Sequence, residues 1–444
     1  MPHLLNITDG TTTLPLSTTS ALLKYFVPRT PELDDAGQYE AVAESIDLLL
    51  YAASTAALQT AHNNLERMLL AARRRATVGA GPKIFLQYQP MNDATLWRSE
   101  VFDGDIRLGK GAMTAFGQAK LPIQLIVTRA PYWEGARTAI PLTNGNGSNN
   151  TAGLTVYAHD DSTAGHDNHT DIAGSAVGGV LPSPLEIQMR NTTGAARGYS
   201  NFYIANNVFG TSIAHILEAE NRTGGYGTVS ADAESSNGQK LLLTGTAPVC
   251  TWDIPAATLQ AAAGRYMRIL ARFPFYPETP SIYVKAAIRD YYGLVTLAEQ
   301  PVEALLATND SLIADLGLLP FPPGGYSTSW AKHVLYLSFR ASSSVTIHLD
   351  FLQLTPADEY CYRHIEQRGM TVAANDWLVD DGIEGLQYLI EGGANHPIYT
   401  EHTPPLHVFP GVNQRLYFLH DGVSPSANWT LSVKAFYRPR RLTI

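Results

Sequence analysis

Cysteine is scarce in this sequence, which has two among 444 residues, Cys250 and Cys361. They lie far apart and form no CxxC pair, so neither a disulfide framework nor a cysteine-rich metal site is indicated. We expect two buried thiols in preference to a disulfide, and the redox compartment stays open.

Long apolar runs are also absent, since no stretch approaches the roughly 20 residues that a membrane-spanning helix needs. The first ten residues, MPHLLNITDG, lack the basic and apolar regions of a secretory signal peptide. We therefore expect a soluble protein without membrane insertion and without an export signal of its own.

Positive charge is in short supply. The net charge is −9, and dense basic runs occur only at 73–75 (RRR) and 438–441 (RPRR). Binding to nucleic acid requires a clustered basic face, so a chain with this balance argues against a nucleic-acid partner. No GxSxG, P-loop or GxGxxG motif occurs in a strand-to-helix setting, and this absence favours a structural role over an enzyme.

The residues that are present predict strands and one helix. An apolar fraction of 45% supplies a sizeable core, and the length indicates about two to four domains. Residues 42–50 alternate between apolar and polar, as in a half-buried strand. From Ser54 the apolar period changes to three and four, which predicts an amphipathic helix over about 54–75 with Ser54 as its cap. Its last residues, the basic run 73–75, meet the negative end of the helix dipole.

Short alternating segments between Gly, Pro and Asn residues predict that most of the remainder is β structure. The strands expected are 84–89, 97–102, 106–108, 121–128, 264–273, 333–339, 345–351 and 431–437. Asp381-Gly382 predicts a hairpin turn, and the Asn and Gly residues of 144–150 predict a linker. The expected fold class is mainly β, with a β-sandwich or split-barrel domain, one amphipathic helix and an inserted antiparallel jelly roll.

The order of the first elements resembles the N-terminal domain of the distal tail (Dit-like) proteins of long-tailed bacteriophages. The resemblance rests on the strand, the helix with its basic end, and the segments GPKIFLQYQ, WRSEVFDGDIRL and LPIQLIVTRAPYWEG. The stretch LHVFPGVNQRLYFLHDGVSPSANWTLSVKAFYRPRRL is similar to the closing segment of that family. The matching positions are Phe409, Pro410, Gly411, Asn413, Tyr437, Arg438 and Arg440.

This resemblance implies a structural virion protein at the tail tip, made in the host cytoplasm, that needs no cofactor. It implies a ring-forming β domain at 1–142, a linker with connecting strands at 143–182, and a segment at 359–444 that packs with the first domain. The partners implied are further copies in a hexameric ring, the tail tube protein, and tail tip or hub proteins.

Residues 183–358 instead resemble the galactose-binding jelly rolls of carbohydrate-binding modules. The segments that carry this resemblance are 216–220 (ILEAE), 252–255 (WDIP) and 349–354 (LDFLQL). In such modules two early glutamates and a late aspartate hold a structural calcium, and the matching positions are Glu218, Glu220 and Asp350. Glutamates two apart on a strand repel each other unless a cation lies between them. The alternative is that these three are solvated residues at a sheet edge.

Aromatic residues in the same part of the chain are candidates for binding a host surface glycan. Tyr199, Phe202 and Tyr203 offer flat apolar rings that match sugar rings, although such residues more often belong to a core or an interface. A sugar-binding function leads to an alternative reading of the whole chain, as a secreted or cell-surface carbohydrate-binding protein without catalytic activity. The missing signal peptide counts against it.

Two sets of residues have the composition of catalytic or metal sites. Residues 159–171 contain His159, His166 and His169 among aspartates, but their spacing places no ligand pair on one helical face. The paired carboxylates Asp380 and Asp381 belong to the predicted turn, and Glu401 with His402 belongs to a predicted loop. We therefore expect neither a catalytic metal nor a glycosidase.

Overall fold

The chain forms two compact units in a computed structural model, and each unit is described by itself. Unit 1 comprises Met1–Thr138, Gly178–Leu181 and Arg438–Ile444, and unit 2 comprises Ala139–Val177 and Pro182–Tyr437. The structure describes all residues except 1–3, 18–20, 24–25, 92, 149–151, 158–166, 209–215, 233–234, 275–280, 291, 293, 307–312, 324–331, 358–359, 399–403 and 421–429.

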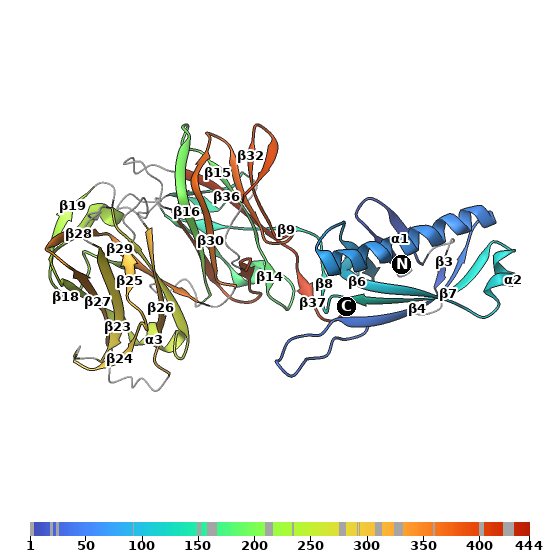
Figure 1. Ribbon diagram of the computed structural model, residues 1–444, viewed down its shortest axis with the longest axis horizontal. Helices are drawn as coiled ribbons and strands as arrows, with labels where there is room; N and C mark the ends of the chain where they lie inside the picture. The colour runs from blue at the N-terminus through green and yellow to red at the C-terminus, as the bar shows by residue number, and fades with distance from the viewer. Residues whose placement is uncertain are drawn as a thin grey trace. The chain divides into compact units, whose positions relative to one another are not determined.

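Unit 1 is an antiparallel sheet with one long helix (Figure 1). Its elements are β1 (Leu4–Thr8), β2 (Thr13–Pro15), β3 (Ala21–Leu23), β4 (Val42–Tyr51), α1 (Thr55–Val78), β5 (Ile84–Gln89), β6 (Trp97–Leu108), α2 (Ala112–Phe116), β7 (Lys120–Arg129), β8 (Trp133–Glu134) and β37 (Arg440–Arg441). The strand order is β2-β1-β5-β6-β7-β4-β3, and β8 pairs with both β6 and β37. The strands predicted at 97–102 and 106–108 are one strand, β6, with an irregularity between Val101 and Asp103.

The helix α1 confirms the prediction made from the period of apolar residues. The Ser54 hydroxyl accepts a hydrogen bond from the Ala57 amide at 3.2 Å, and the helix ends at Gly79, which has the left-handed conformation that glycine adopts most easily. The buried face of α1 packs closely on β6 at Gly104. A Cβ at Gly104 would lie 2.5 Å from Leu69 Cδ2. Buried helix residues are Leu58, Leu65, Met68, Leu69 and Ala72.

Unit 2 contains two apolar cores, and the first is enclosed by strands from both ends of the unit. We call this part the first sandwich. Its elements are β9 (Thr138–Ile140), β10 (Thr143–Asn144), β11 (Gly147–Ser148), β12 (Leu154–Tyr157), β13 (His169–Ile172), η1 (Gly174–Ala176), β14 (Ser183–Pro184), β15 (Glu186–Asn191), β16 (Arg197–Asn207), β30 (Tyr362–Val372), β31 (Trp377–Asp381), β32 (Leu386–Glu391), β33 (Ala394–Pro397), β34 (His407–Val408), β35 (Gln414–His420) and β36 (Thr430–Tyr437). One sheet has the order β11-β10-β13-β35-β16-β30, and the other has the order β12-β36-β15-β31-β32-β33.

The second core is formed by the strands between β16 and β30, which we call the second sandwich. Its elements are β17 (Ile216–Glu218), β18 (Gly224–Gly225), β19 (Thr228–Ala231), η2 (Ser236–Gly238), β20 (Gln239–Gly245), β21 (Val249–Pro255), α3 (Ala256–Ala261), β22 (Tyr266–Arg272), β23 (Ile282–Arg289), β24 (Thr296–Glu299), β25 (Ala304–Leu306), β26 (Ile313–Pro320), β27 (Lys332–Ala341), β28 (Val345–Leu349) and β29 (Phe351–Pro356). The sheets are β17-β29-β22-β26, β18-β21-β27-β23-β24 and β19-β20-β28. A cluster that includes Tyr203, Leu270 and Phe351 packs between the two sandwiches.

The mainly β fold class is confirmed, but the chain divides differently from the predicted domains. Only residues 438–444 of the predicted segment 359–444 belong to unit 1, because β35 and β36 pair with strands of the first sandwich. The predicted linker 143–182 supplies strands of the same sandwich, and so does the start of the predicted jelly roll. Cys250 and Cys361 are buried free thiols, and burial raises the pKa of Cys250. Among the described residues, no helix is long and apolar enough to cross a membrane.

Candidate functional site

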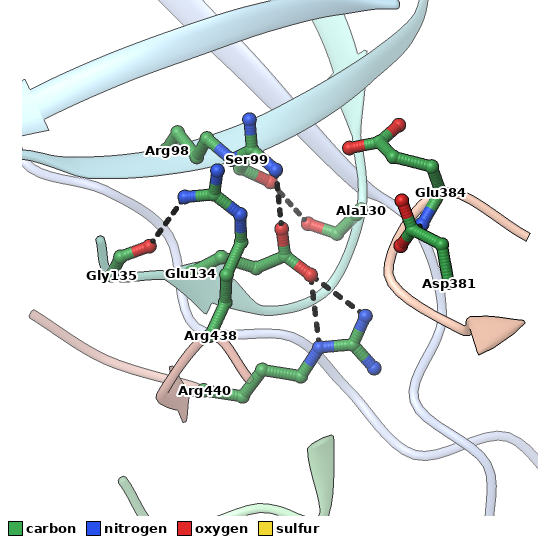
Figure 2. A network of polar contacts seen from close by, with 9 residues as sticks. All are labelled: Arg98, Ser99, Ala130, Glu134, Gly135, Asp381, Glu384, Arg438 and Arg440. Carbon is green, nitrogen blue, oxygen red and sulfur yellow. Dashed lines mark hydrogen bonds and ion pairs between the residues drawn. The ribbon is translucent and has the colours of Figure 1, made fainter. Parts of the chain in front are cut away.

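The return of the chain into unit 1 forms a compact polar junction around Glu134. Backbone pairing of β37 with β8 places Arg440 opposite Glu134, and β6 brings Arg98 to the other side. Arg440 donates two hydrogen bonds to Glu134 Oε1, at 3.0 Å from Nε and 2.7 Å from Nη2, and Arg98 Nη2 lies 3.3 Å from Oε2. Figure 2 shows the carboxylate between the two guanidinium groups. The glutamate is 9% exposed, so these arginines compensate for most of its lost hydration.

Backbone contacts extend the same junction. The Gly135 amide donates to the Pro439 carbonyl at 2.8 Å, and Arg438 donates to the Gly135 carbonyl at 3.0 Å (Figure 2). The guanidinium of Arg440 also lies 3.9 Å from the centre of the Tyr132 ring. The basic run 438–441 therefore closes unit 1, since its arginines bind a carboxylate, a carbonyl and an aromatic ring of that unit.

A second buried ion pair lies where β4 and β7 begin and end. Arg129 is fully buried and donates to Glu44 Oε1 from Nε at 2.9 Å and from Nη2 at 2.7 Å. The remaining donors reach the carbonyls of Ala130 and Arg29, both at 2.8 Å. Burial lowers the pKa of Arg129, and Glu44 opposes that shift. The Arg29 amide also donates to Glu44 at 3.0 Å, so the pair fixes the backbone of residue 29 from both sides.

The basic run 73–75 has local partners. Arg73 Nε lies 2.7 Å from Asp103, and Arg75 donates to the Gly81 carbonyl at 2.7 Å. These contacts belong to the end of α1 and to the neighbouring β6. They account for two of the three charges without any nucleic acid.

The three carboxylates predicted to hold calcium converge on η2 in the second sandwich. The Asp350 side chain is buried, accepts from the Ser236 amide at 2.8 Å and forms an ion pair with Arg272. Glu218 accepts from the Ser236 hydroxyl at 2.8 Å, and Glu220 accepts from Asn237 at 3.2 Å.

Burial disfavours the charged forms of the carboxylates in this cluster, so a nearby cation would stabilise them. Burial raises the pKa of Asp350 to about 6, against the opposing effect of Arg272, and burial also raises the pKa of Glu220. Within the described residues, Glu220 Oε2 is buried without a hydrogen-bond partner. No group of three or more His, Cys, Asp or Glu in that part of the chain is arranged as a metal site. Arg272 thus supplies a positive charge at the place where the sequence predicts calcium, and the calcium itself stays a prediction.

Comparison with known proteins gives no sequence relative. No family model matches the chain, and no curated protein matches it. Among solved structures, the chain is similar to the SPP1 Dit (gp 19.1) protein, described as a paradigm of the hub adsorption apparatus in Gram-positive infecting phages, with 7% identity, a TM-score of 0.31 and 99% of each chain covered. A chain of the phage P2 baseplate in its activated conformation with Ca gives 7% identity and a TM-score of 0.32 with 100% of both chains covered.

A third similarity is to an arabinose-bound α-L-arabinofuranosidase, MgGH51. It has 11% identity and a TM-score of 0.21, and it covers 50% of this chain and 32% of that chain. Likenesses at these levels of identity and TM-score are too weak to assign a function.

Two of the three aromatic residues predicted to bind a sugar are buried. Phe202 belongs to the core of the first sandwich, and Tyr203 is buried in the cluster between the sandwiches, where it stacks on His364 at 4.4 Å. Neither ring has a free face, so the structure contradicts a sugar site at these two residues. The side chain of Tyr199 lies outside the described residues.

The His and Asp residues of 159–171 are described only in part, since 159–166 lie outside the described residues. Asp171 is bound by Arg415 at 2.6 and 2.9 Å, and Asp167 accepts from the Gly145 amide. His169 lies in β13 beside Tyr417, with ring centres 5.7 Å apart. The two aspartates therefore have structural partners.

The carboxylates considered for a glycosidase have structural roles as well. Asp380 is buried and held by Arg363 at 2.9 Å and by Gln387 at 2.7 Å. Asp381 opens the turn between β31 and β32, where it accepts from the Glu384 amide at 3.0 Å. Glu401 and His402 lie outside the described residues.

Sequence reasoning missed the buried ion pairs Glu134–Arg440 and Arg129–Glu44. A weak signal for the first was available, because an acid beside Trp133 in an aromatic segment requires a partner and 438–441 offers three arginines. No comparable signal marks the second pair, whose members lie 85 residues apart in unrelated segments.

Proposed function

We propose that this chain is a structural virion protein of a bacteriophage tail, a distal tail or baseplate hub component that forms a ring between the tail tube and the tail tip. The observation that carries the proposal is the pairing of β37 with β8, which makes unit 2 an insertion into unit 1. The sequence resemblance to distal tail proteins covers both segments that meet there. In this arrangement unit 1 builds the ring, and unit 2 is the module that it carries.

The sheet of unit 1 is open at both edges. The order β2-β1-β5-β6-β7-β4-β3 leaves two three-residue strands, β2 and β3, at its ends. Edge strands carry backbone donors and acceptors that a neighbour can complete, and a head-to-tail contact repeated by rotation closes a ring. We propose a hexamer that binds the tail tube protein on one side and tip or hub proteins on the other.

Negative-stain imaging with a mass measurement of the full chain tests this proposal. The expected result is a six-membered ring, and the Arg440→Met variant, which loses the main partner of Glu134, is expected to form fewer rings. A Lys434→Met variant, which removes a cation of unit 2 that lies over Trp377, is the control and should form rings like the wild type. Single copies in the native virion would overturn the proposal.

Glycan binding by unit 2 is a second function that a specific surface favours. The outer face of the sheet β18-β21-β27-β23-β24 carries Tyr336 under the guanidinium of Arg289, at 3.4 Å from the ring centre, and Tyr283 under Arg340, at 4.4 Å. These residues alternate along their strands with core residues, so they face away from the core. The ion pair of Lys285 with Glu299, at 3.1 Å, lies on the same face.

The arginines, the tyrosine hydroxyls and the Lys285–Glu299 pair supply the hydrogen-bond donors and acceptors that a neutral glycan requires. A glycan array of the full chain tests the assignment, with binding expected for the wild type and lost in Tyr336→Ala. Tyr292→Ala, at an exposed tyrosine in the turn after β23, is the control and should bind normally. Binding that survives Tyr336→Ala would move the site elsewhere. Micromolar binding by a monomer that never forms rings would favour the alternative, a secreted or cell-surface carbohydrate-binding protein.

A further inference from the structure

A hairpin that precedes β4 in unit 1 is the most prominent exposed feature that the fold itself does not use. We call residues 27–41 the arm. Leu33 and Tyr39 form an antiparallel bridge, and the Glu40 amide donates to the Glu32 carbonyl at 2.9 Å. At the tip, the Asp34 side chain accepts from the amides of Ala36 at 2.9 Å and Gln38 at 2.7 Å. The arm thus has a preformed shape before any partner arrives.

The base of the arm is fixed to the core of unit 1. The backbone of Arg29 donates to Glu44 and accepts from Arg129, as described above for the buried ion pair. Arg129 in turn lies over the Trp133 ring at 4.4 Å. A fixed base lowers the entropy lost when the arm binds a partner.

The arm exposes apolar side chains on one face. Leu33 is 59% exposed and Tyr39 is 39% exposed, and as bridge partners they lie on the same side of the hairpin. Leaving a leucine and a tyrosine side by side in water forgoes the stabilisation that their burial would give. Two adjacent exposed apolar side chains of this kind can bind in an apolar pocket of another molecule.

Such a pocket lies at the other end of β4. A cavity of about 340 Å³, which we call the end cavity, opens between β2, the end of β4 and the start of α1. Its volume is in the range of sites that enclose a small molecule or a few side chains, roughly 300–1,000 Å³. Apolar side chains that line it include Leu14, Leu16, Leu50, Leu58 and Leu65.

Charge is distributed in a complementary way between the arm and the end cavity. The arm carries Glu32, Asp34, Asp35 and Glu40 against a single arginine. The residues that line the end cavity include no aspartate or glutamate, and the nearest acids along the chain are Asp9, Asp47 and Glu66. Exposed Lys120 lies opposite the lining residue Tyr51 in the pairing of β4 with β7, and the positive end of the α1 dipole begins just after the lining residue Ala53.

The arm cannot fill the end cavity of its own unit. The ten residues of β4, Val42–Tyr51, separate the two by about 30 Å at roughly 3.3 Å per residue. From its anchored base to its tip the arm spans six residues, about 20 Å by the same rise, and even folded back it would fall short. Figure 1 shows the arm and α2 at opposite ends of β4.

We propose that the arm of one copy inserts Leu33 and Tyr39 into the end cavity of the next copy. This inference rests on the proposed ring. Donor and acceptor surfaces at opposite ends of one strand make the contact heterologous, so every copy gives one arm and receives one. The acidic tip then lies against the basic end of the neighbour, which orients the arm and sets the direction of the ring.

Sedimentation of the full chain measures the association that this contact provides. Leu33→Glu on the arm and Ala53→Trp at the lining of the end cavity are each expected to weaken association at least about tenfold, because each removes the burial of large side chains. Leu70→Glu is the matched control, since Leu70 is 62% exposed on α1 and does not line the end cavity. It should associate like the wild type.

Two further experiments test whether the arm of one copy contacts the end cavity of another. Asp35→Lys and Lys120→Glu are each expected to weaken association, and the double variant is expected to recover much of it, because the opposite signs are restored at the contact. A variant with Leu33→Cys and Ala53→Cys should form a ladder of covalent oligomers on oxidation. The native thiols, Cys250 and Cys361, are both buried and will not interfere.

The outcomes separate this inference from the proposed ring. Rings that form equally in Leu33→Glu, Ala53→Trp and Leu70→Glu would overturn the arm contact and leave the ring in place. Rings that survive while Ala53→Trp releases a bound small apolar molecule would show that the end cavity has a different occupant. A wild-type chain that is monomeric at every concentration and gives no cross-link would overturn the ring and the arm contact together.

Discussion

The buried pair of Arg129 and Glu44 allows the sharpest prediction about stability. Replacing Arg129 with Met removes four hydrogen bonds, two of them to Glu44. Among the described residues, Glu44, which is 2% exposed, then keeps only the hydrogen bond from the Arg29 amide. A buried charge left in this way costs about 3–5 kcal/mol. The loss is a large share of the roughly 5–15 kcal/mol that stabilise a typical folded domain.

Denaturant unfolding measures this loss of stability, and hydrogen exchange shows which strands and loops it affects. Arg129→Met is expected to lower the free energy of unfolding and to speed exchange in β4 and in the arm, while exchange in the second sandwich stays as it is. Glu44→Leu combined with Arg129→Met should recover most of the loss, because no charge is then buried.

Arg73→Met is the matched comparison, since the pair of Arg73 and Asp103 is about half exposed. Exposed pairs contribute about 0–1 kcal/mol, so this variant should change little. If Arg129→Met lowers the free energy of unfolding no more than Arg73→Met does, the buried pair contributes less to stability than we predict.

Three further predictions concern packing, pH and calcium. Gly104→Ala should cost about 1–3 kcal/mol through contact with Leu69, and Leu69→Ala should relieve part of the added cost, as measured by thermal unfolding. Because folding raises the pKa of Asp350 from 3.8 to about 6, the native state binds more protons between those values, and stability should fall by roughly 3 kcal/mol as the pH rises through that window. Asp350→Asn should remove this slope; an identical pH profile would contradict the assignment. The predicted calcium should raise the unfolding midpoint of the wild type by mass action but not that of Glu220→Gln. An equal midpoint with the ion and with a chelator would show that Arg272 neutralises this cluster alone.

Local elements could be read from the sequence because their signals are local. The period of apolar residues after Ser54 predicted α1 to within a few residues at each end, and alternation predicted β4 and β7. Hydrogen bonds within a helix or between adjacent strands depend on neighbours that the sequence places close together. The boundary at Ser54 was marked by the cap residue itself.

The partners of the later strands could not be read in the same way. Alternation shows that β35 and β36 have a buried face, but the same pattern serves any sheet. Their pairing with β16 and β15 assigns them to the first sandwich, and only the few residues of β37 continue into unit 1.

The candidate binding residues show the same limit. Phe202 and Tyr203 have rings suited to sugar contacts, yet packing in the apolar clusters buries both. Glu218, Glu220 and Asp350 each accept a hydrogen bond from η2, but nothing in their spacing revealed that Arg272 would pair with Asp350.

The junction at Glu134 has a consequence for the order in which the protein matures. Arg440 follows Glu134 by 306 residues, so at roughly 5–20 residues per second the ribosome needs about 15–60 s to deliver it. During that interval β8 is not paired with β37, and Glu134 lacks its ion pair with Arg440. A nascent chain released before Arg440 would leave β8 without its partner strand, and we expect such a product not to join a growing particle.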